Sequence, residues 1–162
     1  MKLDGLYDSI GGANFGIVKE FYANKVPEFQ YDGEYTIKIR GKRFKFCVEI
    51  INDELGFRIE SHAQFEAFMK RPAYQAIPEL LCGPNSLAAW NKDRDDCHST
   101  MTRSNLKLPT KVLLRFINKK ILPSGNNSTM SHLRVCLIYA MMTQMLLNMG
   151  KIIIATMARE DG

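Results

Sequence analysis

The chain has 162 residues, of which 46% are hydrophobic and 24% are charged. These fractions are ordinary for a soluble globular protein, and the length suits one domain with a buried core, so a disordered, collagen-like or coiled-coil chain is excluded. The formal net charge is +5 and the isoelectric point is near 9.0, which makes the chain mildly basic.

The N-terminal part of the sequence predicts an arm, a helix and a β-hairpin. Residues 1–13 are rich in glycine and predict a loose arm. From Asn14 the apolar residues follow helical spacing, and Pro27 is a residue type that ends helices. Residues 35–48 then alternate apolar and basic side chains around Gly41, which predicts a β-hairpin.

The rest of the chain predicts helices on both sides of a long loop. Apolar residues at helical spacing predict three short helices, over 50–56, 62–70 and 74–81. Residues 83–107 contain Gly, Pro and a polar cluster, and therefore predict a long loop. Helical periodicity returns at 108–122, which predicts a longer helix. A second longer helix is predicted from the capping residue Ser128 to about Met149, with Gly150 as its stop. Residues 152–157 predict a last helical turn or two.

These elements predict a mainly α fold of the α+β class, a single compact helical domain with one small β-hairpin. The domain is expected to span residues 14–157, and residues 158–162 form a tail.

Targeting features place the chain in the cytoplasm or the nucleus. The N-terminus has no apolar run of the kind that begins a secreted protein. The longest charge-free apolar stretch, residues 135–150, has 16 residues and is shorter than the roughly 20 that cross a membrane. The four cysteines lack a CxxC pair and are expected to be reduced thiols. We therefore expect a protein that is neither secreted nor bound to a membrane.

Charge is distributed unevenly along the sequence. Residues 1–81 hold 11 Lys/Arg and 12 Asp/Glu, whereas residues 82–162 hold 11 and 5, a net charge of +6. Residues 97–159 contain no acidic residue. Basic residues concentrate in the predicted hairpin and along one face of the 108–122 helix, at Lys38, Arg40, Lys42, Arg43, Lys45, Lys107, Lys111, Arg115 and Lys119.

Such basic segments predict contacts with the phosphates of RNA or DNA, independent of base sequence. The alternative is a solvated basic face with ion-pair partners among Asp53, Glu54, Glu60 and Glu66. Phe44 and Phe46 alternate with Lys45, which would suit base stacking, but a small sheet has to bury one face, and we expect both rings in the core.

Metal binding has one weak signal. His132 and Cys136 are four residues apart, a spacing that places both on one face of a helix. A structural zinc site needs four converging ligands, and the other His and Cys residues are isolated in the sequence. A buried thiol beside an imidazole is the simpler interpretation, so no metal and no cofactor are expected.

Catalysis has no clear motif. Asp93, Asp95 and Asp96 cluster in the predicted loop, and a two-metal site would also have to recruit Glu160 and either Asp53 or Glu54. A surface loop explains the acidic cluster more simply. The motifs GxSxG, GxGxxG and GxxxxGK[ST] do not occur. No catalytic residue is identified, and a metal-dependent nuclease or transferase is the least favoured alternative.

Three stretches resemble one family when taken together. They are VKEFYAN at 18–24, IRGKRFKF with IINDELGF at 39–57, and the block at 115–153 that contains Leu-Pro, His-Leu-Arg and Leu-Ile-Tyr-Ala. In this order and spacing they resemble the family named "putative plant transposon protein domain", found in plant retroelement-derived open reading frames. The resemblance covers roughly residues 15–157. It departs from the family at 83–107, where the family continues a helical pattern.

The resemblance implies an accessory or structural product of a retroelement rather than its polymerase, integrase or protease. The family has no assigned catalytic residues, so none is carried over. The shared positions favour packing roles for Phe21, Tyr22, Asn52, Leu122, Pro123 and Tyr139.

The leading expectation is a non-catalytic interaction module of retroelement origin that binds RNA or DNA electrostatically. The alternative is a protein-interaction scaffold that uses the Met-rich C-terminal helix, where Met141, Met145 and Met149 follow helical spacing. No small-molecule ligand is evident.

Overall fold

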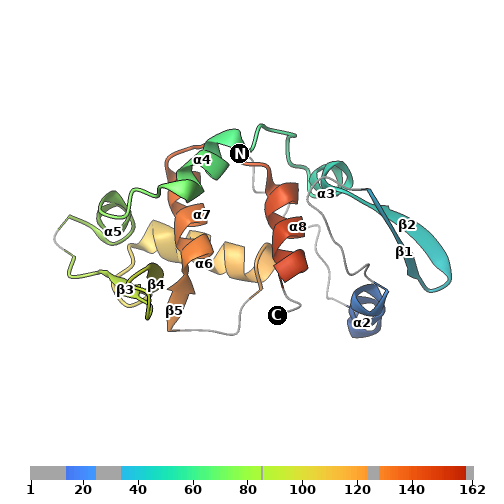
Figure 1. The fold of residues 1–162 in the computed structure, drawn as a ribbon, viewed down its shortest axis with the longest axis horizontal. Helices are drawn as coiled ribbons and strands as arrows, with labels where there is room; N and C mark the ends of the chain where they lie inside the picture. Colours follow the sequence, from blue (N-terminus) through green and yellow to red (C-terminus); the bar gives the residue numbers. More distant parts are fainter. Residues whose placement is uncertain (1–13, 25–33, 85, 124–127, 160–162) are drawn as a thin grey trace. The chain divides into compact units, whose positions relative to one another are not determined.

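The computed structural model describes residues 14–24, 34–84, 86–123 and 128–159 (Figure 1). Within these ranges it has seven helices and five strands in two small sheets, with 49% of the residues in helices and 16% in strands. The predicted mainly α fold of the α+β class is therefore confirmed, with one more sheet than expected. No helix in these ranges is long and apolar enough to cross a membrane. The predicted arm at 1–13 lies outside the described residues.

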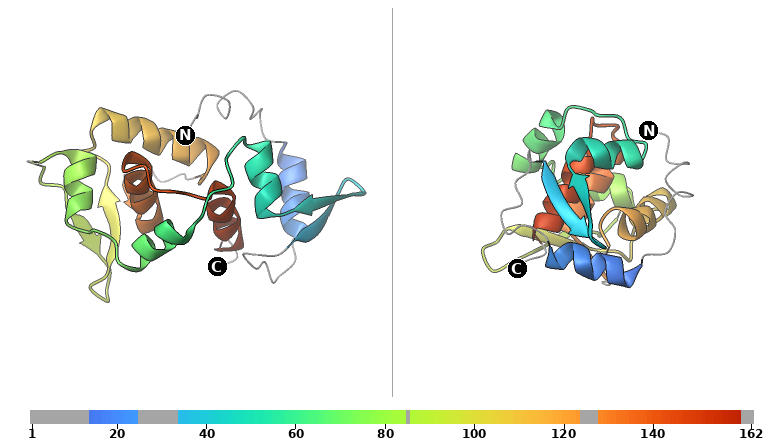
Figure 2. Two further views of the ribbon diagram at one scale, coloured as in Figure 1. Left: turned by 90° about the horizontal axis from the view of Figure 1, so that it is seen from above. Right: turned by 90° about the vertical axis from the view of Figure 1, so that its right-hand side faces the viewer.

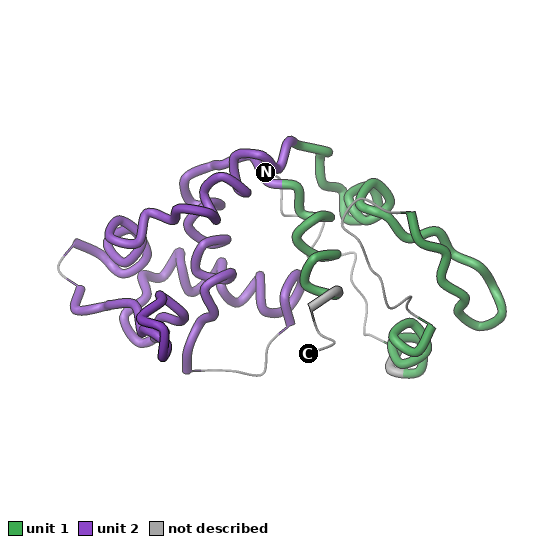
Figure 3. Tube along the Cα trace, in the orientation of Figure 1, with its two compact units in different colours: residues 1–60, 148–162 green, residues 61–147 purple. Residues whose placement is uncertain are grey.

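The chain forms two compact units (Figure 3). Unit 1 combines residues 1–60 with residues 148–162, and unit 2 is the continuous segment 61–147. The single domain predicted over 14–157 thus includes both units, which are described separately below.

Unit 1 contains a helix, a hairpin and two further helices, namely α2 (Phe15–Ala23), β1 (Tyr35–Ile39), β2 (Lys42–Phe46), α3 (Val48–Glu54) and α8 (Met149–Arg159). The predicted hairpin is confirmed, with β1 and β2 antiparallel and Ile37 opposite Phe44. Ile37 is fully buried, and the ring of Phe46 packs edge-on against Phe21 with centroids 5.2 Å apart. Phe44 is 49% exposed, so the expectation that it lies in the core is wrong.

Two buried asparagines join α3 to α8. Asn52 Nδ2 donates to Asn148 Oδ1 at 2.9 Å, and Asn52 Oδ1 accepts from the backbone N–H of Gly150 at 2.8 Å. Asn148 Oδ1 also accepts from the backbone N–H of Lys151, which satisfies a free donor in the first turn of α8. These bonds fix the two helices against each other across 96 positions of sequence.

Gly150 is essential to this contact because its backbone lies close to α3. A Cβ at this position would meet the carbonyl oxygen of Val48 at 2.6 Å. The predicted role of Gly150 as a helix stop is therefore wrong, and the residue lies in the first turn of α8 instead. Next to the asparagines, Val48, Ile51 and Ile154 form the apolar core of this helix pair.

Unit 2 is built around one buried helix. Its elements are α4 (Ala63–Lys70), α5 (Ala76–Cys82), β3 (Trp90–Lys92), β4 (His98–Thr102), α6 (Leu108–Lys120), β5 (Thr129–Ser131) and α7 (His132–Met142). Helix α7 packs against α5, α6 and β4, and the left view of Figure 2 shows it between α4 and α6. On the α4 side, Phe68 and Tyr139 stack with centroids 5.3 Å apart. Burial on several sides explains why α7 is apolar around much of its surface.

A three-stranded sheet occupies part of the segment predicted as a loop. β4 pairs antiparallel with β3 and with β5, and Met101 lies opposite Met130, both fully buried. The loop prediction for 83–107 is therefore wrong over β3 and β4. These strands are short and polar, and they lack the alternation that marks a strand in a sequence.

The boundaries of α7 also differ from the prediction. Ser131, at the end of β5, is the N-cap of α7, and the predicted cap Ser128 lies before β5. The predicted continuous helix to Met149 is wrong. It ends at Met142, because the Thr143 hydroxyl donates back into the last turn and Gln144 takes a left-handed φ of 57°.

Candidate nucleic-acid interface

The hairpin of unit 1 carries basic side chains on one face. Its two-residue turn, Arg40-Gly41, has φ values of 52° and 76°, which is the geometry of a type I′ turn. This turn fixes the register that places Lys38 directly opposite Arg43. Side chains alternate across a sheet, so Lys38, Arg43 and Lys45 share one face while Ile37 and Phe46 point to the other. We call Lys38, Arg43 and Lys45 the hairpin basic face.

Two of the five predicted hairpin cations have acidic partners. Glu20 of α2 accepts from the backbone N–H of Arg40 at 2.8 Å and pairs with its guanidinium at 3.5 Å. Lys45 pairs with Glu34 at 3.3 Å, with both side chains mostly exposed. Neither carboxylate is among the four partners that the sequence suggested.

Lys38 and Arg43 have no acidic partner among the residues that the structure describes. Like charges directly opposite each other in a sheet destabilise it. An anion bound between the two side chains would remove this repulsion. Lys42 is also exposed and lacks an acidic partner in the described chain, but it lies on the opposite face, across from Ile39.

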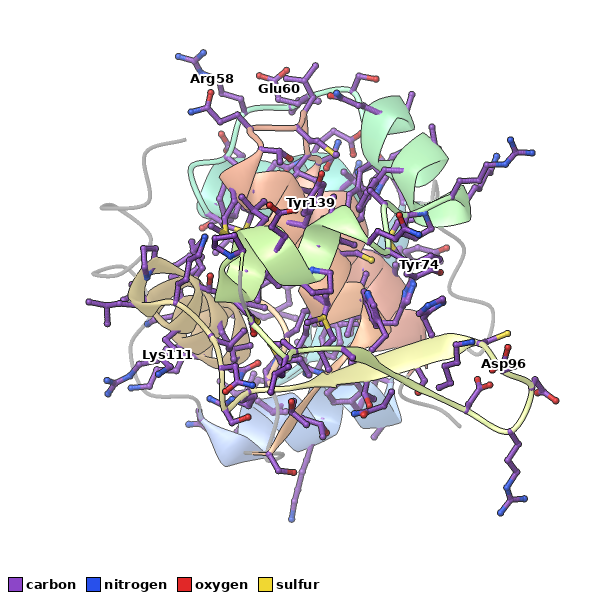
Figure 4. All side chains as sticks on the ribbon, turned by 90° about the vertical axis from the view of Figure 1, so that its left-hand side faces the viewer. Arg58, Glu60, Tyr74, Asp96, Lys111 and Tyr139 are labelled. Carbon is purple, nitrogen blue, oxygen red and sulfur yellow. The ribbon has the colours of Figure 1, made fainter. Side chains whose placement is uncertain are left out.

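The second predicted group of cations lies along α6 in unit 2. Lys107, Lys111, Arg115 and Lys119 are all exposed, and we call them the α6 basic face. Lys111 points away from the helix into solvent in Figure 4. The helix contains no acidic residue, and the exposed Leu108 lies beside these cations. The hairpin basic face and the α6 basic face belong to different units, so each is a surface of its own.

The structure brings together four rings that sequence reasoning missed. Tyr74 and His98 stack with centroids 4.0 Å apart and an interplanar angle of 14°. Trp90 stands almost perpendicular to both, at 5.4 Å and 5.8 Å, and its Nε1 donates to the carbonyl oxygen of Tyr74 at 3.0 Å. His132 completes this ring cluster at 5.5 Å from Trp90. The four residues come from separate segments and follow no local spacing, so the sequence held no signal for the cluster.

A hydrogen bond links Tyr74 to His132 within the ring cluster. The Tyr74 hydroxyl and His132 Nε2 are 3.1 Å apart. Burial, with a smaller effect of His98, lowers the pKa of His132, and burial raises the pKa of Tyr74. Both groups are therefore neutral at pH 7, and the tautomer of the imidazole decides which of them donates.

The predicted His132–Cys136 neighbourhood is a contact between an imidazole and a buried thiol, with the sulfur 3.9 Å from the ring nitrogens. Burial raises the pKa of Cys136 to about 12, so this sulfur is a neutral thiol and a poor metal ligand. Across the described residues, no group of three or more His, Cys, Asp or Glu side chains is arranged to hold a metal ion.

The acidic cluster has a local role in the β3–β4 turn. Asp93 Oδ1 accepts from the backbone N–H groups of Asp95 and Cys97, and Asp96 pairs with Lys92 at 2.9 Å. Figure 4 shows Asp96 at the tip of this turn. The surface-loop interpretation fits these bonds.

The Met-rich helix of the scaffold alternative is not one helix. Met141 lies in α7, Met145 follows the end of that helix, and Met149 is fully buried at the start of α8. The three side chains therefore do not form the single helical stripe that the spacing predicted.

Comparison with known proteins gives one match. A family model described as "Putative plant retrotransposon-related domain" matches residues 1–161 of the chain. No curated protein and no solved structure matches it.

Proposed function

Because the chain belongs to the plant retrotransposon-related domain family and is thus of retroelement origin, we propose that it is a module that binds RNA or DNA through phosphate contacts. Binding does not depend on base sequence in this proposal, since phosphates carry no sequence information. The two basic faces defined above each supply one set of contacts.

The observation that carries the proposal is the pair Lys38 and Arg43. Opposite charges across a strand pair stabilise a sheet, whereas like charges that face each other cost stability. Here the pair persists next to Arg40 and Lys45, each of which has a carboxylate partner. Among the described residues the facing pair has no acid, and a surface selected only for solubility gains nothing from this arrangement. A surface that binds phosphate needs cations that no carboxylate already occupies.

The α6 basic face supports the same function from unit 2. Four exposed cations at four-residue spacing follow one side of the helix, and α6 has no acid to compete with a phosphate. Lys119 has a second role, since a cation in the last turn stabilises the helix dipole. Lys111 and Arg115 lie further from the helix end, so their charges are better explained by a bound anion.

A salt-dependent titration tests the proposal. Fluorescence anisotropy of labelled single-stranded RNA, single-stranded DNA and duplex DNA is measured between 50 and 200 mM salt, on the order of the range in which phosphate binding weakens steeply. We expect the logarithm of affinity to fall linearly with the logarithm of salt concentration. In the double variant Lys38→Gln/Arg43→Gln, the slope should decrease by about 1.4 to 1.8, from two lost contacts.

The matched control is Arg58→Gln/Lys70→Gln, which removes the same charge from two exposed positions outside both basic faces. It should leave the slope nearly unchanged. The Lys38→Gln/Arg43→Gln variant should also melt no earlier than the parent, because it relieves a like-charge pair. Equal losses in both double variants would show a nonspecific charge effect. Undetectable binding by the parent at low salt would end the proposal and leave the protein-interaction alternative.

A further inference from the structure

A surface pocket of ≈ 500 Å³ opens beside the ring cluster in unit 2. Tyr74, Trp90 and His98 form its aromatic wall, and Gln75, Glu79 and Ser86 are among the polar residues of its lining. All three rings are half-buried, so each keeps part of its surface accessible. The pocket therefore offers flat π surfaces next to hydrogen-bonding groups.

The rings are held rigidly by one another. Tyr74 stacks on His98, its backbone carbonyl accepts from the Trp90 indole, and its hydroxyl is hydrogen-bonded to His132. A planar ligand that stacks here does not have to order loose side chains first, which lowers the entropic cost of binding.

A cation of the α6 basic face, Lys107, lies close to Gly83, one of the residues that line this pocket. A Cβ placed on Gly83, which lines the pocket, would be 3.4 Å from Cε of Lys107. The Lys107 side chain thus passes beside the pocket, and its backbone is anchored by a 3.0 Å bond to Leu81. Inside the pocket the one acidic residue is Glu79. The positive charge of Lys107 favours a phosphate beside Gly83, and the negative charge of Glu79 disfavours a phosphate inside the pocket.

From this arrangement we infer that the pocket binds one unpaired nucleobase, which stacks against the ring cluster while its phosphate contacts Lys107. Aromatic and imidazole rings stack on bases of single strands, since these have accessible faces. Glu79 accepts from an exocyclic amine, as carboxylates do with cytosine. The inference rests on the proposed function, and it adds that single strands are preferred over duplexes.

The chain contains one tryptophan, Trp90, so its intrinsic fluorescence reports on this pocket directly. The full-length protein is titrated with a 12-nucleotide oligocytidylate, with an abasic oligomer of the same length, and with a blunt duplex. Anisotropy of an end label on each nucleic acid measures binding in parallel. We expect oligocytidylate to quench Trp90 fluorescence, and the abasic strand and the duplex to bind without quenching.

A variant separates stacking from charge. His98→Ala removes the ring stacked on Tyr74 and should weaken oligocytidylate binding by roughly 5- to 100-fold, while affinity for the abasic strand is unchanged. Tyr139→Phe, in the other stacked pair of unit 2, is the control and should change neither affinity. The parent titrations need no variant, so the test survives if His98→Ala fails to fold.

The outcomes distinguish the inference from the proposed function. Binding of all three nucleic acids without quenching by oligocytidylate would overturn the base pocket and leave phosphate binding intact. Absence of binding to any of them would overturn both. Quenching by tetramethylammonium chloride but not by oligocytidylate would overturn the base pocket in favour of a cation site at Trp90 and Glu79.

Discussion

At the scale of single residues, burial in unit 2 keeps several titratable groups neutral. His132 is hydrogen-bonded to the Tyr74 hydroxyl and lies against the Cys136 sulfur, so a proton on its ring would place a charge in a half-buried site. The thiol of Cys136 is neutral for the same reason, since burial raises its pKa to about 12. Protonation of the His132 imidazole is therefore expected to destabilise the ring cluster.

We expect unit 2 to lose stability as the pH falls below 6.5, the ordinary pKa of histidine. The pKa of His132 is lowered in the folded chain, so below 6.5 the unfolded chain binds a proton that the folded chain does not. The free energy of unfolding therefore decreases from pH 6.5 down to the lowered pKa. Urea midpoints followed by Trp90 fluorescence between pH 7.5 and 5.5 measure this decrease.

The variant His132→Gln keeps a hydrogen-bond acceptor for Tyr74 but does not titrate. Its urea midpoint should change less over the same pH interval than that of the parent. Identical pH dependence in the two proteins would show that another group is responsible.

At the scale of secondary-structure elements, the contact between α3 and α8 depends on a glycine inside a helix. Gly→Ala in a helix usually stabilises a protein by up to about 1 kcal/mol, because alanine has the higher helix propensity. At Gly150 the added Cβ would meet the Val48 carbonyl oxygen at 2.6 Å, and that backbone atom cannot rotate away. Packing therefore reverses the sign of the helix-propensity effect.

Gly150→Ala should destabilise unit 1 by about 1–3 kcal/mol, the usual cost of overpacking. Gly16→Ala in α2 is the matched control, since its Cβ would meet the flexible end of Arg40 at 3.0 Å. The control should be neutral or slightly stabilising. Thermal melts followed by circular dichroism, with hydrogen exchange of α3 amides, distinguish the two. The packing argument fails if Gly150→Ala melts with the parent.

The elements that the sequence predicted well are those fixed by local residues. The β1–β2 hairpin follows from strand alternation and from Gly41 in its turn, all within 12 residues. The sheet in unit 2 could not be predicted in this way, because Thr100 pairs with Ser131 from a distant segment. The role of Gly150 likewise depends on Val48, far away in the sequence.

In the candidate site, too, only the features set by local sequence could be predicted. The basic residues are visible as a charge pattern, and their exposure follows from that pattern. Their partners are not visible, since Glu20 reaches Arg40 from another element. The ring cluster depends on four segments of unit 2 and could not be found before the fold was known.

At the scale of the whole molecule, unit 1 is assembled from both ends of the chain and unit 2 from its middle. Helix α8 supplies Ile154 to the core of unit 1, and Asn148 next to it bonds to Asn52. Unit 2 is formed by one continuous segment, which contains the strands β3, β4 and β5 and the buried helix α7.

We expect a chain that ends at residue 147 to keep unit 2 folded and to lose the protection of α3. Without α8, Val48 and Ile51 have no apolar partner from Ile154, and Asn52 loses both of its hydrogen bonds. Hydrogen exchange measured by mass spectrometry should show fast exchange in α3 and slow exchange in α6 and α7. A chain that lacks only residues 160–162 is the control. Protection of α3 that survives the longer truncation would contradict this dependence.

The asparagine pair also sets an order of events during synthesis. The ribosome adds roughly 5–20 residues per second, and Asn148 follows Asn52 by 96 positions. The nascent α3 therefore waits on the order of 5 to 20 seconds for its partner, while the whole of unit 2 is synthesised. Throughout this interval Val48 and Ile51 have Phe46 and Leu55 beside them but lack Ile154, and we expect this incomplete apolar core to be open to chaperones during translation.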